Sequence, residues 1–298
     1  LGYDDIIQNG GELKNWGHEF TASWTQKLNK DISVNLGGNI TFMKNKVISL
    51  AEDLPGGIII DARANNGSAE ARTLPGYPIG SFYGYVIDGL YQTDLDRLVS
   101  PFAGSVGTYL NGDFKYKDVN GDGVITPDDR TVIGNPSPDF IYGGSVGVKY
   151  KRLNLDIDFG GVYGNEVFRV WGALESPFQR VNYPALKLER WHGAGTSNWE
   201  PIISQARRFN YNGSTYNIED GSYFRIRNLQ LGYDLMSSVL SKVRVKNLRV
   251  FVNIQNLKTW KNNNGYTSEF GGRATAFGFD EAGGAIPRVT TFGLNVNF

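Results

Sequence analysis

The sequence has 298 residues with 30 basic and 30 acidic side chains, so its formal net charge is zero. Without a basic excess the chain lacks the electrostatic attraction that nucleic acids require, and we expect no nucleic-acid partner. The absence of Cys and the presence of only two His exclude disulfides, zinc–thiolate sites and metal sites built from several histidines.

Seven segments alternate between apolar and polar residues, the period-2 pattern of a strand with two different faces. In chain order they cover residues 13–28, 31–46, 138–151, 153–165, 222–235, 247–257 and 287–298. The last segment is the clearest, because Leu294 and Val296 alternate with Asn295. In the fifth, the apolar face switches between Ile226 and Leu229, which predicts a β-bulge.

These strands are long. Most have roughly 11 to 16 residues, whereas an ordinary strand has about 5–6 and a membrane-spanning strand needs about 9–11. The connections also alternate in length: those at 29–30, 151–152 and 236–247 are short, and those at 47–137, 166–221 and 258–286 are long. Outer-membrane barrels show this alternation, with short periplasmic turns and long external loops.

The fold predicted from these patterns is all-β, a transmembrane antiparallel β-barrel in the bacterial outer membrane. Seven is an odd number, and an open seven-stranded sheet would leave two unpaired edges in lipid. We therefore expect residues 1–298 to form the C-terminal part of a larger barrel, with residues 1–11 as the tail of an external loop and Phe298 ending at the periplasmic side. The alternative is a secreted all-β sandwich, whose strands also alternate.

The segment 118–129 reads D-x-N-x-D-G-x-x-x-x-x-D and matches a calcium-binding loop of the EF-hand type. A hard cation needs several oxygen ligands, and Gly123 permits the sharp turn. The candidate ligands are Asp118, Asn120, Asp122, the carbonyl of Val124, and Asp129. The final Asp is shorter than the usual Glu and no helix flanks the loop, so a turn held by its own side chains is the alternative.

The long loops are rich in aromatic residues, which can stack on sugars or anchor a protein partner. The candidates for substrate or partner contact are Phe82, Tyr83, Tyr85, Tyr91, Trp171, Trp191 and Trp199. The alternative for most of them is a small core inside the folded loops.

Catalysis finds little support in the sequence. Asp156 and Asp158 could act as a carboxylate pair of a glycosidase, but both fall on a polar strand face and would simply line a lumen. Neither His18 nor His192 has an identifiable triad partner. We expect no enzyme activity.

Several stretches resemble the SusC/RagA family of TonB-linked outer-membrane transporters of Bacteroidetes. They are NGGELKNWGHE at 9–19, GYPIGSFYGY at 76–85 followed by DGLYQ at 88–92, GDFKYKD at 112–118 followed by IGNPSPDF at 133–140, and DGSYFRIRNLQLGY at 220–233. The stretch 260–269 fits the family only loosely.

The resemblance implies a 22-stranded barrel filled by a plug domain, with the plug and the TonB box outside this chain. It also implies a SusD-like lipoprotein partner, energy delivered by TonB, and a glycan or a peptide as the imported substrate, the glycan being favoured. Two other functions stay open at this point: a passive porin, and a secreted carbohydrate-binding or adhesive protein.

Overall fold

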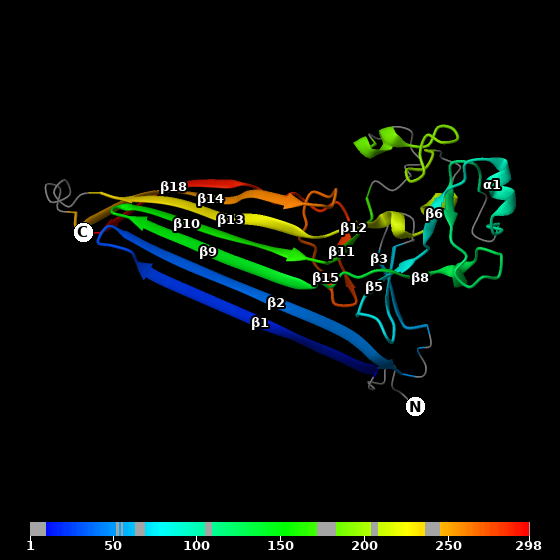
Figure 1. Ribbon diagram of the computed structural model, residues 1–298, viewed down its shortest axis with the longest axis horizontal. Helices are drawn as coiled ribbons and strands as arrows, with labels where there is room; N and C mark the ends of the chain where they lie inside the picture. The colour runs from blue at the N-terminus through cyan, green and yellow to red at the C-terminus, as the bar shows by residue number, and fades with distance from the viewer. Residues whose placement is uncertain are drawn as a thin grey trace, which may run out of the picture.

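The computed structural model describes residues 10–51, 54, 56–62, 69–104, 109–171, 183–203, 208–235 and 245–297. Its main feature is a seven-stranded sheet in the order β1-β2-β9-β10-β13-β14-β18, with every neighbouring pair antiparallel (Figure 1). The strands are β1 (Gly11–Lys27), β2 (Ile32–Leu50), β9 (Phe140–Tyr150), β10 (Leu153–Tyr163), β13 (Tyr223–Asp234), β14 (Asn247–Lys261) and β18 (Val289–Asn297).

Each of these strands coincides with a segment that alternates in the sequence. β2 and β14 run on to Leu50 and Lys261, beyond the expected ends at 46 and 257. The predicted bulge is confirmed: β13 skips Arg227 in its register with both neighbours. Residues 1–9 and Phe298, about which the sequence made predictions, lie outside the described residues.

The register collects apolar side chains from all seven strands on one face of the sheet, which we call the apolar face. One row across it consists of Trp24, Leu36, Val146, Ile157, Leu229, Ile254 and Thr290. The adjacent row points to the opposite side, the polar face, and consists of Thr25, Asn35, Gly147, Asp156, Gln230, Asn253 and Thr291. Alternation along each strand thus becomes two chemically different surfaces of one sheet.

The apolar face is not the inside of a sandwich. Leu294 and Val296 are 67% and 41% exposed, and Val34 and Ile157 are only partly buried. In the described ranges no fully buried core forms against the middle of this face, since the buried apolar residues lie almost entirely outside the seven strands. A second protein layer, which the sandwich requires, is therefore missing from the part of the chain that the structure describes.

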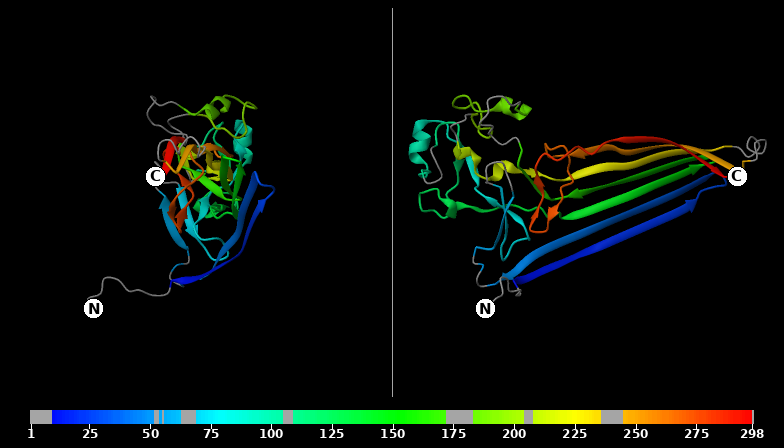
Figure 2. Two further views of the ribbon diagram at one scale, coloured as in Figure 1. Left: turned by 90° about the vertical axis from the view of Figure 1, so that its left-hand side faces the viewer. Right: turned by 180° about the vertical axis from the view of Figure 1, so that it is seen from behind.

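The three long connections fold together at one end of the sheet, opposite the short turns (Figures 1 and 2). We call their described residues between 51–139, 164–222 and 262–288 the loop layer. It contains α1 (Asp94–Val99) and the strands β3 (Ile58–Ala62), β4 (Ala69–Thr73), β5 (Ser81–Gly84), β6 (Ile87–Leu90), β7 (Phe114–Tyr116), β8 (Thr131–Gly134), β11 (Glu166–Arg169), β12 (Ile218–Asp220), β15 (Gly272–Arg273), β16 (Ala276–Phe277) and β17 (Phe279–Asp280). Four short 3-10 helices at Pro127–Asp129, Ala185–Glu189, Arg208–Tyr211 and Thr215–Asn217 complete it.

The loop layer holds the hydrophobic core of the described chain. Its larger cluster consists of Tyr85, Leu90, Tyr91, Ala103, Phe114, Tyr116, Ile125, Phe209 and Tyr216. A smaller cluster joins Phe82, Phe168 and Val170. The long connections are thus packed structures with their own small sheets. Within the described ranges, no helix combines the length and apolar character that crossing a membrane requires.

Candidate functional site

The polar face carries a network of amide and carboxylate side chains. The Asn253 amide donates to Asn228 at 2.7 Å, and the Asn228 amide donates to Asp158 at 3.3 Å. Asp156 lies 4.0 Å from the guanidinium of Arg249. The two carboxylates that could have formed a glycosidase pair therefore lie on the polar face, as the sequence predicts, and both have partners among the groups beside them.

A pocket of about 420 Å³ lies where the polar face meets the loop layer. Its lining is mostly apolar, with contributions from the outer ends of four sheet strands and from all three long connections. The lining residues are Met43, Ile79, Pro136, Ser137, Pro138, Ile141, Val162, Asn165, Tyr223, Ser268, Glu269, Phe270, Ala274, Phe277 and Gly278. The local sequence pattern gives no sign of this pocket, because its walls come from segments far apart in the chain.

Polar groups of the pocket wall differ in how well they are satisfied. Glu269 accepts hydrogen bonds from the Tyr223 hydroxyl at 3.1 Å and from Arg225 at 2.8 Å. Arg225 is buried and also donates to Thr259 at 2.7 Å, so the carboxylate is held in one place. The Oδ1 atom of the buried Asn165 accepts no hydrogen bond in the described structure. An unpaired buried amide oxygen is costly, and a donor entering the pocket would relieve that cost.

Three of the aromatic contact candidates are core residues. Phe82, Tyr85 and Tyr91 are buried, and burial raises the pKa of Tyr85 to about 12. The prediction that they contact a substrate or partner is wrong for this conformation, because the loops fold over one another and need an apolar interior. The alternative given with that prediction, a small core, describes these three correctly.

The other four aromatic candidates are more accessible. Tyr83 stacks against Arg72, whose guanidinium lies 3.8 Å from the ring centre, and donates a hydrogen bond to a backbone carbonyl. The indoles of Trp171 and Trp191 are partly buried and donate hydrogen bonds within the loop layer, at 2.6 Å and 3.1 Å. Trp199 is 51% exposed. Of the seven candidates, Trp199 is the one that clearly offers a ring to a ligand or a partner.

The loop 118–129 is bonded to itself through the side chains named as calcium ligands. The Asp118 carboxylate accepts from the amides of Gly121 and Gly123 at 2.6 Å and 2.7 Å. Those bonds, led by the one from Gly123, lower the pKa of Asp118. The buried Asp129 accepts from Val119 at 2.9 Å and from the Thr126 amide at 2.7 Å.

The remaining candidate ligands form Asx turns in the same loop. Asn120 accepts from the Asp122 amide at 2.9 Å, and Asp122 accepts from the Val124 amide at 2.8 Å. In the described ranges no group of three or more His, Asp or Glu side chains is arranged to hold a metal ion. The turn held by its own side chains therefore accounts for the observed geometry, and calcium binding stays a prediction.

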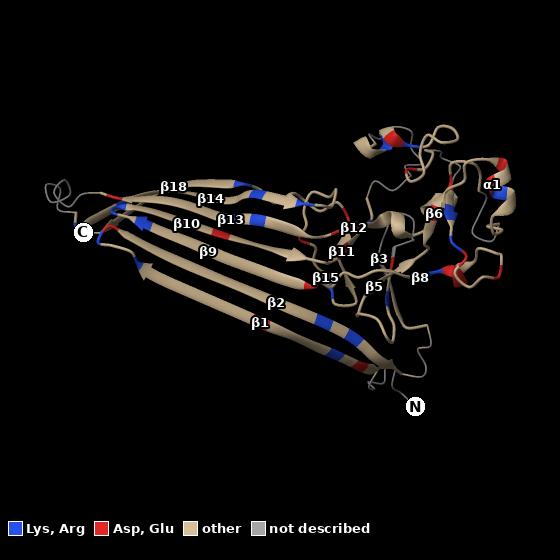
Figure 3. Ribbon diagram, in the orientation of Figure 1, with Lys and Arg blue, Asp and Glu red and all other residues tan. Residues whose placement is uncertain are grey.

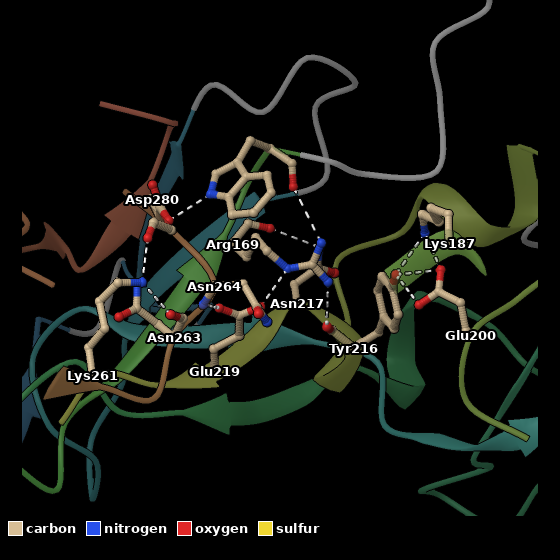
Figure 4. A network of polar contacts seen from close by, with 12 residues as sticks. Arg169, Lys187, Glu200, Tyr216, Asn217, Glu219, Lys261, Asn263, Asn264 and Asp280 are labelled. Atoms are coloured by element: carbon tan, nitrogen blue, oxygen red, sulfur yellow. Dashed lines mark hydrogen bonds and ion pairs between the residues drawn. The ribbon is translucent and has the colours of Figure 1, made fainter. Parts of the chain in front are cut away.

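A buried polar cluster that the sequence did not reveal holds the loop layer together (Figure 4). Lys187 forms an ion pair with Glu200 and donates to the Tyr216 hydroxyl at 2.8 Å. Tyr216 in turn donates to Glu200 at 2.8 Å, and all three residues are buried. Since Lys187 and Tyr216 lie on separate short 3-10 helices and Glu200 lies in a loop, no periodicity in the sequence could have signalled that they meet.

No protein-family model matches the chain. TonB-dependent receptor P3 of Formosa agariphila is 32% identical to it over 309 residues, which cover 100% of this chain and 30% of the receptor. TonB-dependent receptor SusC of Bacteroides thetaiotaomicron is 23% identical over 237 residues, 78% of this chain and 21% of SusC. A solved structure of the RagAB peptide transporter matches with a TM-score of 0.73 at 21% identity, over 98% of this chain and 30% of that chain, so the two share a fold. The chain spans about 30% of the length of its first two receptor relatives.

Proposed function

Because the chain is similar over its whole length to a TonB-dependent receptor and over 78% of its length to SusC, we propose that it forms part of a SusC-type TonB-dependent receptor and that the whole protein imports a bulky nutrient across the bacterial outer membrane. The substrate is an oligosaccharide or a peptide. The seven-stranded sheet forms part of the barrel wall, with its polar face toward the lumen and its apolar face toward lipid. The work of import comes from TonB, so no residue of this chain needs to catalyse a reaction.

The exposed apolar face is the observation that carries this proposal. A row of aromatic rings crosses it near the loop layer: Phe42 lies 6.5 Å from Phe20 and 5.5 Å from Phe140, which stacks on Tyr163 at 5.0 Å. The exposed Tyr150 marks the opposite end of β9. The two ends of β9, Phe140 and Tyr150, are ten residue steps apart, which is about 33 Å along the strand, or about 25 Å across a bilayer for a tilt of about 40°. Outer-membrane barrels have an apolar band of about that height between two aromatic girdles.

The free edges of the sheet support closure into a larger barrel. In the described residues β1 and β18 each pair with one neighbouring strand, β2 and β14. Unpaired backbone groups at those edges could not remain in lipid, so further strands must complete the wall. We propose the 22-stranded barrel with a plug that the family resemblance implies.

The outer surface of the loop layer suits the SusD-like lipoprotein that we propose as partner. Leu95, Leu98 and Val99 of α1 are between 66% and 81% exposed, and Trp199 offers a further exposed ring. Apolar side chains grouped on a surface mark protein contacts more often than isolated ones do. Below this surface, the pocket beside Asn165 lies on the polar face, where an incoming substrate would pass.

Nutrient uptake by the whole receptor in cells tests the proposal. A strain lacking the receptor gene is complemented with the wild-type gene, and growth on glycans and on peptides is compared with and without TonB. The expected result is growth on one nutrient class that requires both the receptor and TonB. Uptake that persists without TonB, together with open conductance of the purified receptor in a planar bilayer, would identify a passive porin instead. A receptor that stays in solution without detergent would favour the secreted binding protein.

A further inference from the structure

Figure 3 shows basic residues on β1 and β2 at the end of the sheet nearest the loop layer, and the strand register places three lysines there on the apolar face. Lys14 of β1 pairs directly with Lys46 of β2, and Lys44 lies two pairs further along, opposite Trp16. All three are exposed, and they share their face with Phe42, because alternate residues of a strand point to the same side. We call these lysines the rim cluster.

The rim cluster is unfavourable by itself. Like charges directly opposite each other on neighbouring strands destabilise a sheet, and diagonal neighbours are only about 7–8 Å apart. In the described ranges, none of the three lysines forms an ion pair with an acidic side chain. Lys14 instead places its ammonium 5.8 Å from the ring centre of Trp16. A bound anion would relieve the repulsion among the three charges.

The position of the rim cluster relative to the membrane indicates which anion it can bind. Lys44 and Lys46 follow Phe42 of the aromatic row by two and four residues, about 7 Å and about 13 Å along the strand. With a strand tilt of about 40° these lengths become about 5 Å and about 10 Å above the row. The headgroup layer, where lipid phosphates lie, adds about 5–8 Å on each side of the hydrocarbon core, so Lys44 lies within this layer and Lys46 lies just beyond it.

We propose that the rim cluster binds the phosphate groups of a lipid in the outer leaflet, a glycolipid that carries two phosphates. The inference rests on the proposed function to the extent that the apolar face must contact the membrane. Two phosphates match three lysines that are spread over two strands, while Trp16 and Phe42 contact the first methylene groups of the lipid. Such a lipid would neutralise the cluster and fasten this part of the barrel wall to its membrane.

Lipid binding by the whole receptor in detergent tests the inference. The probe is diphosphorylated lipid A, titrated and counted by native mass spectrometry, and the variant is Lys14→Gln/Lys44→Gln/Lys46→Gln. One lysine contributes roughly a fivefold gain in binding to an anionic surface, so we expect the triple variant to bind about 100-fold more weakly. The matched control is Lys27→Gln/Lys30→Gln/Lys151→Gln, three exposed lysines at the opposite end of the sheet, which should bind lipid A like the wild type.

Two further arms identify the ligand. Dephosphorylated lipid A should bind the wild type as weakly as the variant binds lipid A, and inorganic phosphate at equal concentration should not displace the lipid. Equal binding by wild type and variant, or displacement by inorganic phosphate alone, would overturn the inference. If lipid A binding fails in this way but the receptor still inserts into phosphate-free bilayers, only the lipid site is refuted and the proposed transport function stands. A receptor that inserts into no bilayer refutes the transport function itself.

Removing like charges should not unfold the sheet. Heat-modifiable mobility on gels, in which the folded barrel and the boiled, unfolded chain migrate differently, checks the folding of each variant before lipid is added. A triple variant that is folded and yet binds lipid A with unchanged affinity contradicts the proposal directly.

Discussion

Val146 gives a direct test of which medium the apolar face contacts. It lies near the middle of β9 and pairs with Leu36 on β2 and Ile157 on β10. Its neighbour Ser145 points to the polar face, where it pairs with Gly37 and Asp158. The two positions share a strand and a depth and differ in the face they occupy, so identical substitutions at them form a matched pair.

Arginine should be tolerated on one face only. An Arg on the lipid face near the bilayer midplane costs about 2–4 kcal/mol, so Val146→Arg should reduce the folding equilibrium constant about 30-fold to about 900-fold. Ser145→Arg faces the lumen opposite the Asp158 carboxylate and should change stability by about 0.5 kcal/mol or less. The measurement is the urea midpoint of the whole receptor in lipid vesicles.

Substituting Val146 by a larger apolar residue distinguishes whether its side chain contacts lipid or a packed protein layer. Lipid chains rearrange around a bulkier residue, so we expect Val146→Phe to leave the urea midpoint unchanged or slightly raised. A packed protein layer would not rearrange, and overpacking it costs about 1–3 kcal/mol. A clear loss of stability in Val146→Phe, or equal losses in Val146→Arg and Ser145→Arg, would refute the assignment of the two faces.

Three further predictions concern the loop layer. Glu200→Gln leaves the buried Lys187 without its counter-charge and should cost about 3–5 kcal/mol, seen as faster amide exchange in the loop layer, whereas unchanged exchange would contradict the role given to this pair. The pKa of Asp118 is lowered chiefly by the hydrogen bond from the Gly123 amide. The ionised Asp118 should therefore stabilise the loop fully above about pH 3.9, and this stabilisation should be lost as the pH falls through the lowered pKa. Hydrogen exchange of the Gly123 amide measured against pH checks this, and a loss of protection at a higher pH would count against it. Calcium binding is tested by titrating the receptor and its Asp122→Ala variant, and an identical response of the two would remove calcium from this loop.

The strands could be predicted because alternation is a local property. Which side of β9 is apolar depends on residues 140–150 alone, and the bulge at Arg227 shows in the sequence as a switch of the apolar face between Ile226 and Leu229. Strand length and the alternating length of the connections then indicated a barrel wall, with no knowledge of any contact. The shared fold with the RagAB transporter agrees with that reading.

The sequence alone left the loop layer undecided, since its contacts join distant segments. Tyr91 packs on Tyr109, and Tyr109 packs on Phe209 at 5.5 Å, about a hundred residues further along the chain. An aromatic residue in a long loop can equally be a ligand contact or part of a core, and only the folded arrangement shows that Tyr91 is buried.

The rim cluster likewise could be predicted only in part from the sequence. Its lysines are plain in the sequence, but only the register of β1 with β2 places Lys14 opposite Lys46. The physical reason is general to this chain: the two faces of each strand follow from its own residues, whereas a pocket, a core or a charge cluster needs side chains from several strands or loops. Those side chains come together only when the loops close and the strands pair, and the local sequence pattern does not indicate which distant residues will meet.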